Sequence, residues 1–142
     1  MNGAVTVATM DGANVEIHQA VGDDNIVIFG MTTPEVNALK ARGYNPHDYF
    51  NGDDRIKEAI QRMYNGINGC TFNDVANSLK DRDPYMVLAD FDSYRKAQAY
   101  ITECYNDRIK WAKMSLNNIA GAGIFSADRA VSEYADNIWH LR

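Results

Sequence analysis

The first 29 residues carry the pattern that most constrains this fold. Residues 5–9 are rich in β-branched side chains, which is typical of a strand. A turn at residues 10–12 is followed by a predicted helix over residues 13–21, which ends at the Gly-Asp-Asp of residues 22–24. Residues 26–29 form a continuous apolar run, the pattern of a strand covered on both faces. This order predicts a βαβ unit with two parallel strands.

The middle of the chain alternates helices with loops. Thr32 and Pro34 predict the start of a helix that ends at Gly43. A second helix, ending near Gly66, carries one apolar face: Ile56, Ala59, Ile60, Met63 and Tyr64. A short helix is expected to end near Leu79, and residues 86–89 are expected to form a third short strand.

The last third of the chain is predicted to be helical. Three apolar stripes recur at helical spacing: Tyr94, Ala97, Ile101, Cys104 and Tyr105; then Ile109, Ala112, Leu116 and Ile119; then Val131, Tyr134, Ala135, Ile138 and Trp139. Residues 121–123 (Gly-Ala-Gly) predict the end of the second of these helices. Ser126 is the predicted N-cap of the last helix, with Asp128 in its first turn, and the last stripe is expected to face inward.

The pattern predicts two or three parallel strands and about six helices, and so few strands are unusual for a parallel sheet. The chain shows no internal repeat, low-complexity tract or linker. We therefore expect an α/β fold in which residues 1–142 form one segment, helix-rich in its C-terminal half, of a larger α/β domain whose other strands lie outside it.

Composition excludes several classes of protein. The chain has 142 residues, 46% of them apolar and 23% charged, which is the balance of a globular domain. The net charge is -5 and no basic stripe occurs, so nucleic acid is not expected as a partner. No apolar run is long enough to span a membrane, and the first residues do not resemble a signal peptide. Cys70 and Cys104 do not make a disulfide framework, so a reducing cytoplasm is expected.

The polar residues suggest few sites. His18, His47 and His140 are not spaced as metal ligands. Asp90-Phe91-Asp92 begins like a calcium loop, but Arg95 and Ile101 stand where its glycine and glutamate belong, so Asp90 or Asp92 is expected to cap the next helix instead.

The strand-to-helix turn at Asp11-Gly12 is the position where an anion could bind. The negative charge of Asp11 favours a helix-capping carboxylate over a phosphate site. Asp11 and Glu16 could form an acid–base pair, although carboxylates at a helix start are more often dipole partners. Trp111 and Trp139 could stack on sugars, but at helical spacing a core or interface position is favoured. No catalytic, cofactor-binding or metal residue is assigned.

The most specific feature is a resemblance. Residues 2–16, NGAVTVATMDGANVE, resemble the NGALTIGTMDGANVE stretch of α-glucan (glycogen, starch or maltodextrin) phosphorylases, with three conservative differences in fifteen positions. The resemblance continues along the whole chain at Ile28–Met31, Arg42–Tyr44, Tyr49, Leu88–Phe91, Tyr94, Trp111, Asn117–Ala120, Gly123, Phe125–Arg129, Tyr134, Ile138 and Trp139.

The resemblance implies a GT-B arrangement, in which two Rossmann-like domains face a cleft. It implies that phosphate attacks the non-reducing end of an α-1,4-glucan and releases glucose 1-phosphate. It also implies a pyridoxal phosphate held on a lysine, with the cofactor's phosphate group serving as the proton-shuttling partner.

The family's functional residues have no counterparts in this chain. The cofactor lysine lies a few positions before the family's equivalent of Asn2-Gly3-Ala4, and the first lysine of this chain is Lys40. We therefore expect this chain to be the C-terminal segment of a phosphorylase. We expect the segment to bind no cofactor, to be inactive without the rest of the phosphorylase chain, and to self-associate through an open sheet edge. An independently folding interaction or scaffold module and a small glucan-binding domain remain the alternatives.

Overall fold

The computed structural model describes residues 2–141. The chain divides into two compact units, the first comprising the residues up to 28 and from 97 onward, and the second comprising residues 29–96. Helix α6 (Val87–Asn106) contributes residues to both units. Within the described part of the chain, no helix is long and apolar enough to cross a membrane.

The first unit contains the predicted βαβ motif. Strands β1 (Val7–Ala8) and β2 (Val27–Ile28) pair in parallel, with Val7 opposite Val27 and Ala8 opposite Ile28. Helix α1 (Ala13–Val21) and the short 3-10 helix η1 (Asp23–Asn25) connect them. The parallel pairing is confirmed, but each strand is shorter than the sequence predicted. In the described sheet of two strands, each strand has one neighbour, so ladder hydrogen bonds form only where the two overlap.

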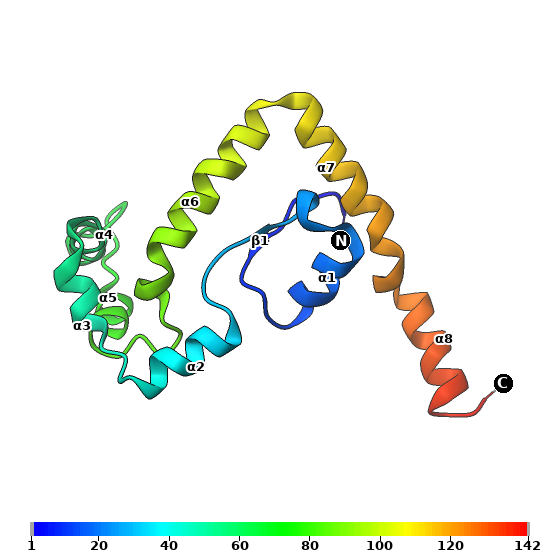
Figure 1. The fold of residues 1–142 in the computed structure, drawn as a ribbon, viewed down its shortest axis with the longest axis horizontal. Coiled ribbons are helices and arrows are strands. Elements are labelled where there is room, and N and C mark those ends of the chain that lie inside the picture. Colours follow the sequence, from blue (N-terminus) through cyan, green and yellow to red (C-terminus); the bar gives the residue numbers. More distant parts are fainter. Residues whose placement is uncertain (1, 142) are drawn as a thin grey trace. The chain divides into compact units, whose positions relative to one another are not determined.

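The remaining elements of the first unit are helical. Helices α7 (Arg108–Ala120) and α8 (Ala127–Asn137) are joined by the 3-10 helix η2 (Gly121–Phe125), and α1 lies beside α7 (Figure 1). The Asp107 carboxylate caps α7, because its Oδ1 accepts hydrogen bonds from the backbone N–H groups of Ile109 and Lys110 at 3.1 and 3.0 Å.

Gly121 lets α1 approach the end of α7. A Cβ atom at this position would lie 2.9 Å from the carbonyl oxygen of Ala20 and 3.0 Å from a methyl group of Val21. Gly121 is also the C-cap of α7, so the predicted helix end at residues 121–123 is confirmed. The absence of a side chain at Gly121 allows the close contact with α1.

Two apolar stripes of the first unit do not face the core. Ile109, Leu116 and Ile119 are 52–68% exposed, whereas Met114 and Asn118 form the buried side of α7. Val131, Tyr134, Ile138 and Trp139 are 51–59% exposed, so the prediction that the last stripe faces inward is wrong. Ile138 and Trp139 also lie beyond the end of α8. The described residues provide no element that covers these faces.

Ser126 stands at the N-cap of α8, as predicted, but its side chain makes no capping hydrogen bond. Asp128 lies in the first turn of this helix.

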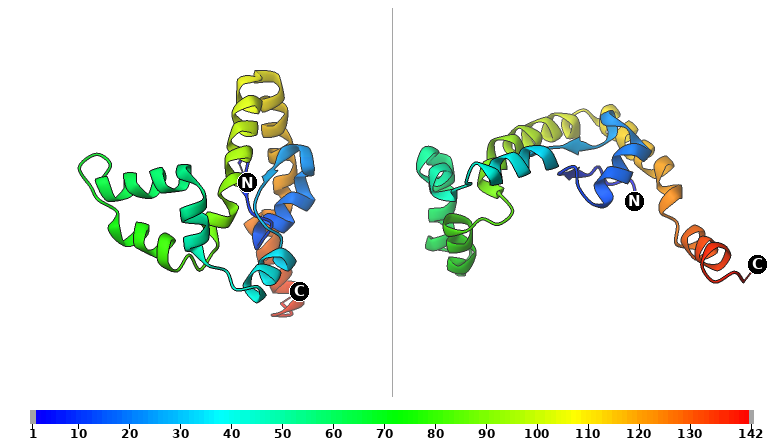
Figure 2. Two further views of the ribbon diagram at one scale, coloured as in Figure 1. Left: turned by 60° about the vertical axis from the view of Figure 1, so that its left-hand side comes forward. Right: turned by 60° about the horizontal axis from the view of Figure 1, so that its bottom comes forward.

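The second unit is an all-helical cluster. It contains α2 (Thr33–Ala41), α3 (Pro46–Gly52), α4 (Asp54–Asn65), α5 (Asn73–Asp81) and the first half of α6. Helices α3, α4 and α5 lie side by side (Figure 2). The core of the second unit consists of Ile56, Ile60, Ala76 and Leu88. The predicted face of α4 is confirmed at Ile56 and Ile60, which are buried, and at Met63 and Tyr64, which are partly buried, but Ala59 is exposed. The C-cap of α4 is Gly66. Thr32 is confirmed as the cap of α2, since its backbone N–H donates to the Glu35 carboxylate at 2.7 Å.

The third strand predicted at residues 86–89 is absent from the described structure. Met86 adopts a left-handed conformation (φ 56°), and residues 87–89 form the first turn of α6. The apolar run is short enough to suit either a strand or a buried helix turn, and the residues before it decide between the two. The fold is therefore helix-rich, with a small parallel sheet of two strands.

Candidate functional site

Three polar side chains converge at the turn between β1 and α1. The Thr9 hydroxyl donates to Asp11 Oδ1 at 3.0 Å, and Asn14 Nδ2 donates to the Thr9 carbonyl oxygen at 3.1 Å and to Asp11 Oδ1 at 3.4 Å. Gly12, not Asp11, is the N-cap of α1, so the predicted cap is wrong. Glu16 is exposed in the first turn and forms no described contact with Asp11. The turn is therefore a locally satisfied structure that presents negative charge.

An asparagine cluster holds this βαβ unit against α7. Asn118, which is fully buried, donates from Nδ2 to the Asn25 carbonyl oxygen at 2.7 Å and to the Met114 carbonyl oxygen at 2.9 Å. Asn117 Nδ2 donates to Asn25 Oδ1 at 2.9 Å, and Asn25 Nδ2 donates to the Val21 carbonyl oxygen at 2.8 Å. The two carbonyl acceptors fix the orientation of the Asn118 amide, which leaves its Oδ1 buried without a donor among the described residues.

Asp83 is a buried carboxylate of the second unit with three hydrogen-bond donors. It is 1% exposed, and it accepts hydrogen bonds from the backbone N–H groups of Val87 (2.9 Å) and Leu88 (2.8 Å) and from the Tyr44 hydroxyl (2.6 Å). Burial, together with the adjacent Asp83 carboxylate, raises the pKa of Tyr44 well above its ordinary value. Asp83 therefore starts α6 and ties it to the loop between α2 and α3.

The prediction that Asp90 or Asp92 caps this helix is wrong, because both lie inside α6. Asp90 Oδ1 instead accepts the backbone N–H of Met31 at 2.9 Å, and Ser93 Oγ accepts that of Gly30 at 2.9 Å. Burial raises the pKa of Asp90. Sequence reasoning missed Asp83, although an aspartate four residues before an apolar helix start was the available signal.

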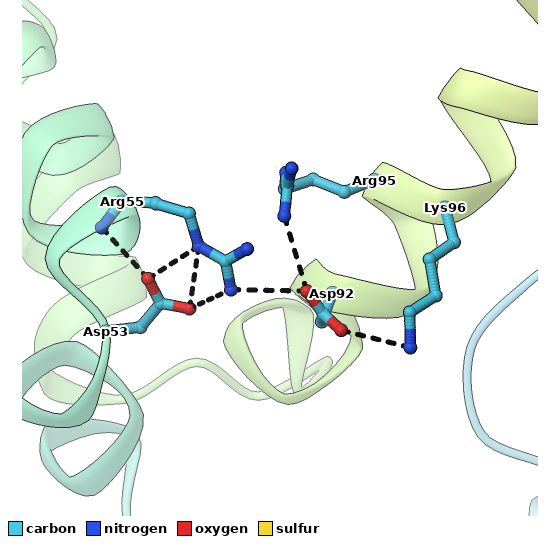
Figure 3. A network of polar contacts seen from close by, with 5 residues as sticks. All are labelled: Asp53, Arg55, Asp92, Arg95 and Lys96. Atoms are coloured by element: carbon cyan, nitrogen blue, oxygen red, sulfur yellow. Dashed lines mark hydrogen bonds and ion pairs between the residues drawn. The ribbon is translucent and has the colours of Figure 1, made fainter.

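Asp92 joins a network of charges on the surface of the second unit (Figure 3). Its Oδ1 lies 3.2 Å from Arg55 Nη2 and 3.4 Å from Arg95 Nη1, and its Oδ2 lies 3.2 Å from Lys96 Nζ. Arg55 also pairs with Asp53, the N-cap of α4, and hydrogen bonding from Arg55 lowers the pKa of Asp53 to about 2. Because these groups are solvent-exposed and mutually paired, the network connects α4 with α6 and offers no activated base or nucleophile.

The histidines lie apart from one another. His18 pairs with Asp23 at 2.5 Å, His47 pairs with Asp81 at 3.4 Å, and His140 contacts the Asp136 carbonyl oxygen at 3.1 Å. The described residues include no group of three histidine, cysteine or acidic side chains that could hold a metal ion.

The tryptophans form two separate aromatic pairs. Trp111 meets Tyr105 edge-on at 5.1 Å, and Trp139 stacks on Tyr134 at 5.9 Å. Trp111 is half-buried, in line with the core interpretation, whereas Trp139 is exposed. Both cysteines are free thiols; Cys104 is buried and Cys70 is exposed.

The chain matches known proteins along nearly its whole length. Residues 1–141 match the family described as carbohydrate phosphorylase. The chain is 42% identical over 146 residues to glycogen phosphorylase of Synechocystis sp., an alignment that covers 100% of this chain and 17% of that protein. It is 39% identical to the brain form of glycogen phosphorylase from Ovis aries and 38% identical to the muscle form from Rattus norvegicus, over 98% and 99% of this chain and 17% of each relative.

These relatives confirm the resemblance seen in residues 2–16. The chain spans 17% of the length of the curated relatives that it matches. At this identity, and with the family match extending over residues 1–141, the chain belongs to the carbohydrate phosphorylase family.

Proposed function

We propose that this chain is the C-terminal portion of an α-glucan phosphorylase, and that the whole protein uses phosphate to release glucose 1-phosphate from α-1,4-glucan. The observation that carries the proposal is the family match over residues 1–141, together with relatives that are glycogen phosphorylases. The C-terminal position rests on the resemblance of residues 2–16 to the stretch that follows the family's cofactor lysine. The βαβ unit then belongs to a Rossmann-like domain of a GT-B enzyme.

The contacts of three lysines and the charge of Asp11 argue against a pyridoxal phosphate site in this chain. A lysine that forms a Schiff base must be reachable as the neutral amine, usually through burial or a neighbouring cation. Lys57 and Lys96 instead pair with aspartates. Hydrogen bonds with Cys104 and with the Tyr100 hydroxyl raise the pKa of Lys110, which also lies 4.7 Å from the centre of the Tyr100 ring. The Asp11 carboxylate at the start of α1 would repel a phosphate group. We therefore place the cofactor and the catalytic residues elsewhere in the whole protein.

The contribution of this chain is structural in this proposal. The asparagine cluster and the close contact at Gly121 join α1 and the residues before β2 to α7, and β1 is attached through its pairing with β2. According to the resemblance, the lysine-bearing segment leads directly into β1. The pairing of β1 with β2 then sets the direction in which that segment leaves the sheet, which is the kind of support that a precisely placed cofactor requires.

The exposed apolar faces of α7 and α8 support the proposal that they contact a partner surface outside these 142 residues. Exposed apolar patches of this kind mark sites of protein contact. In the whole protein we assign their cover to the rest of the phosphorylase chain. When the 142-residue chain is alone, the same faces and the open sheet edges favour self-association. We place the protein in the cytoplasm, with which the two free thiols agree.

The test is an assay of glucose 1-phosphate formation from maltodextrin and phosphate, run in parallel on two polypeptides. One is the 142-residue chain, and the other is the product of the complete reading frame that contains it. We expect product from the second only, together with the absorbance of a bound Schiff base. Product from the 142-residue chain alone, or none from the complete protein, would contradict the proposal.

A further inference from the structure

A small hollow opens on the second unit between the end of α2 and the start of α3. Its volume is about 260 Å³, and it is lined by Leu39, Gly43, Tyr44, Asn45, Asp48 and Tyr49. Pockets for drug-sized ligands usually measure roughly 300–1,000 Å³. The hollow therefore suits a single small ring better than an extended ligand.

Two tyrosine rings form its apolar wall. The centres of the Tyr44 and Tyr49 rings are 5.3 Å apart, and their planes are inclined at 46°. The hydrogen bond from the Tyr44 hydroxyl to buried Asp83 holds one ring, and packing against the Ile56–Ile60 core holds the other. Because both rings are fixed before a ligand arrives, little side-chain entropy is lost on binding.

An amide and a carboxylate supply the polar edge. Asn45 Nδ2 donates to Asp48 Oδ1 at 3.0 Å, and both side chains are exposed. Asn45 Oδ1 also accepts the backbone N–H of His47 at 3.2 Å, so a ligand hydroxyl group would bond to the second Nδ2 hydrogen of Asn45 or to the Asp48 carboxylate. None of the six lining residues is a cation, so the hollow offers an anion no charge partner.

Rings with an apolar C–H face and a rim of hydroxyl groups match this arrangement. Aromatic side chains combine an apolar face with polar neighbours in the way such ligands require. We propose that the hollow binds one glucose ring of an α-1,4-glucan, with the ring face on Tyr49 or Tyr44 and its hydroxyl groups on Asp48 and Asn45. The choice of glucose as the sugar rests on the proposed phosphorylase function; the site itself rests on the hollow.

The test is titration of the ¹⁵N-labelled 142-residue chain with maltose, followed by amide chemical shifts. We expect saturable shifts confined to residues 39–49. Asp48→Ala should weaken maltose binding at least about fivefold, because it removes a charge-assisted hydrogen bond to the sugar. Glu58→Ala, which removes an exposed acidic side chain of α4 outside the hollow, should bind like the unchanged chain.

Tetramethylammonium provides the competing ligand class, because tyrosines beside a carboxylate can also hold a cation. Shifts at residues 39–49 with this cation and none with maltose would overturn the proposal, and so would equal maltose affinities for Asp48→Ala and the unchanged chain. Neither result depends on the glucose 1-phosphate assay, so failure of the hollow and failure of the phosphorylase proposal are separate outcomes.

Discussion

Removal of the Asp83 carboxylate is expected to be among the most damaging single changes in the second unit. This side chain is buried and accepts three hydrogen bonds, from the Tyr44 hydroxyl and from the backbone N–H groups of Val87 and Leu88. Asp83→Ala leaves all three donors without this acceptor, and the substituted residue must keep a left-handed backbone (φ 35°).

The magnitude follows from these contacts. Loss of a capping carboxylate at a helix start costs about 0.5–2 kcal/mol, and loss of the hydrogen bond from the partly buried Tyr44 hydroxyl to a charged acceptor costs about 1.5–3 kcal/mol. The left-handed backbone adds about 1 kcal/mol for alanine, whereas aspartate and asparagine tolerate that region better. Because neighbouring terms do not simply add, we expect Asp83→Ala to destabilise the chain by about 2–5 kcal/mol and Asp83→Asn, which keeps one acceptor oxygen, by less.

Urea unfolding followed by far-UV circular dichroism measures the change in the free energy of unfolding. Hydrogen exchange at the Val87 and Leu88 amides tests whether the loss arises at the start of α6. Asp92→Ala is the matched control, because its partners are solvent-exposed and such pairs contribute about 0–1 kcal/mol. The reasoning is refuted if Asp83→Ala unfolds within about 0.5 kcal/mol of the unchanged chain, the range of ordinary surface substitutions.

Four further outcomes are expected. Gly121→Ala should destabilise by about 1–3 kcal/mol, since its Cβ would lie 2.9 Å from a carbonyl oxygen of α1, whereas Gly123→Ala meets nothing within 4 Å. Ile138→Ala should cost less than about 1 kcal/mol in urea unfolding, because this side chain is 59% exposed. The Asp53 carboxylate, whose pKa is lowered to about 2, contributes stability that is present above its unfolded pKa of about 3.9 and is lost as pH falls toward 2, and Arg55→Ala should remove most of that acid-side loss. Light scattering at ~100 µM should show oligomers, where micromolar association would be detected.

Each of these outcomes has a clear counter-result. Equal stabilities of the two glycine variants would show that α1 does not pack against the end of α7. A loss of 2–5 kcal/mol in Ile138→Ala, the usual range for a buried side chain, would show that the end of α8 is covered. An unchanged acid profile in Arg55→Ala would separate Asp53 from its partner, and a clean monomer would show that the exposed faces do not drive association.

Local sequence determined the elements whose causes lie within a few residues. The β-branched run before Met10 and the apolar run from Ile26 predicted two parallel strands, which pair as expected. Thr32 and Gly66 predicted a helix start and a helix end, because capping is satisfied by neighbours along the chain. Residues 2–16 also identified the family, since so long a match requires no knowledge of packing.

Tertiary contacts decided what periodicity could not. Residues 87–89 are a helix turn and not a strand, because Asp83 accepts the first backbone N–H groups of α6 from a loop that is also tied to Tyr44, 39 residues away in the sequence. Asp90 could not be placed from its neighbours, since its partner is the backbone of Met31, 59 residues away.

The same limit explains α7 and α8. A helical period predicts which side chains share a face, but not which face another element covers. On α7 the covered face contains Met114 and Asn118, because Asn118 is hydrogen-bonded to Asn25, which lies 93 residues away in the sequence. The more apolar stripe of Ile109, Leu116 and Ile119 remains exposed. The sequence by itself therefore determined most of the elements and the family, whereas the tertiary structure decided which surfaces they bury, because burial depends on neighbours that are distant along the chain.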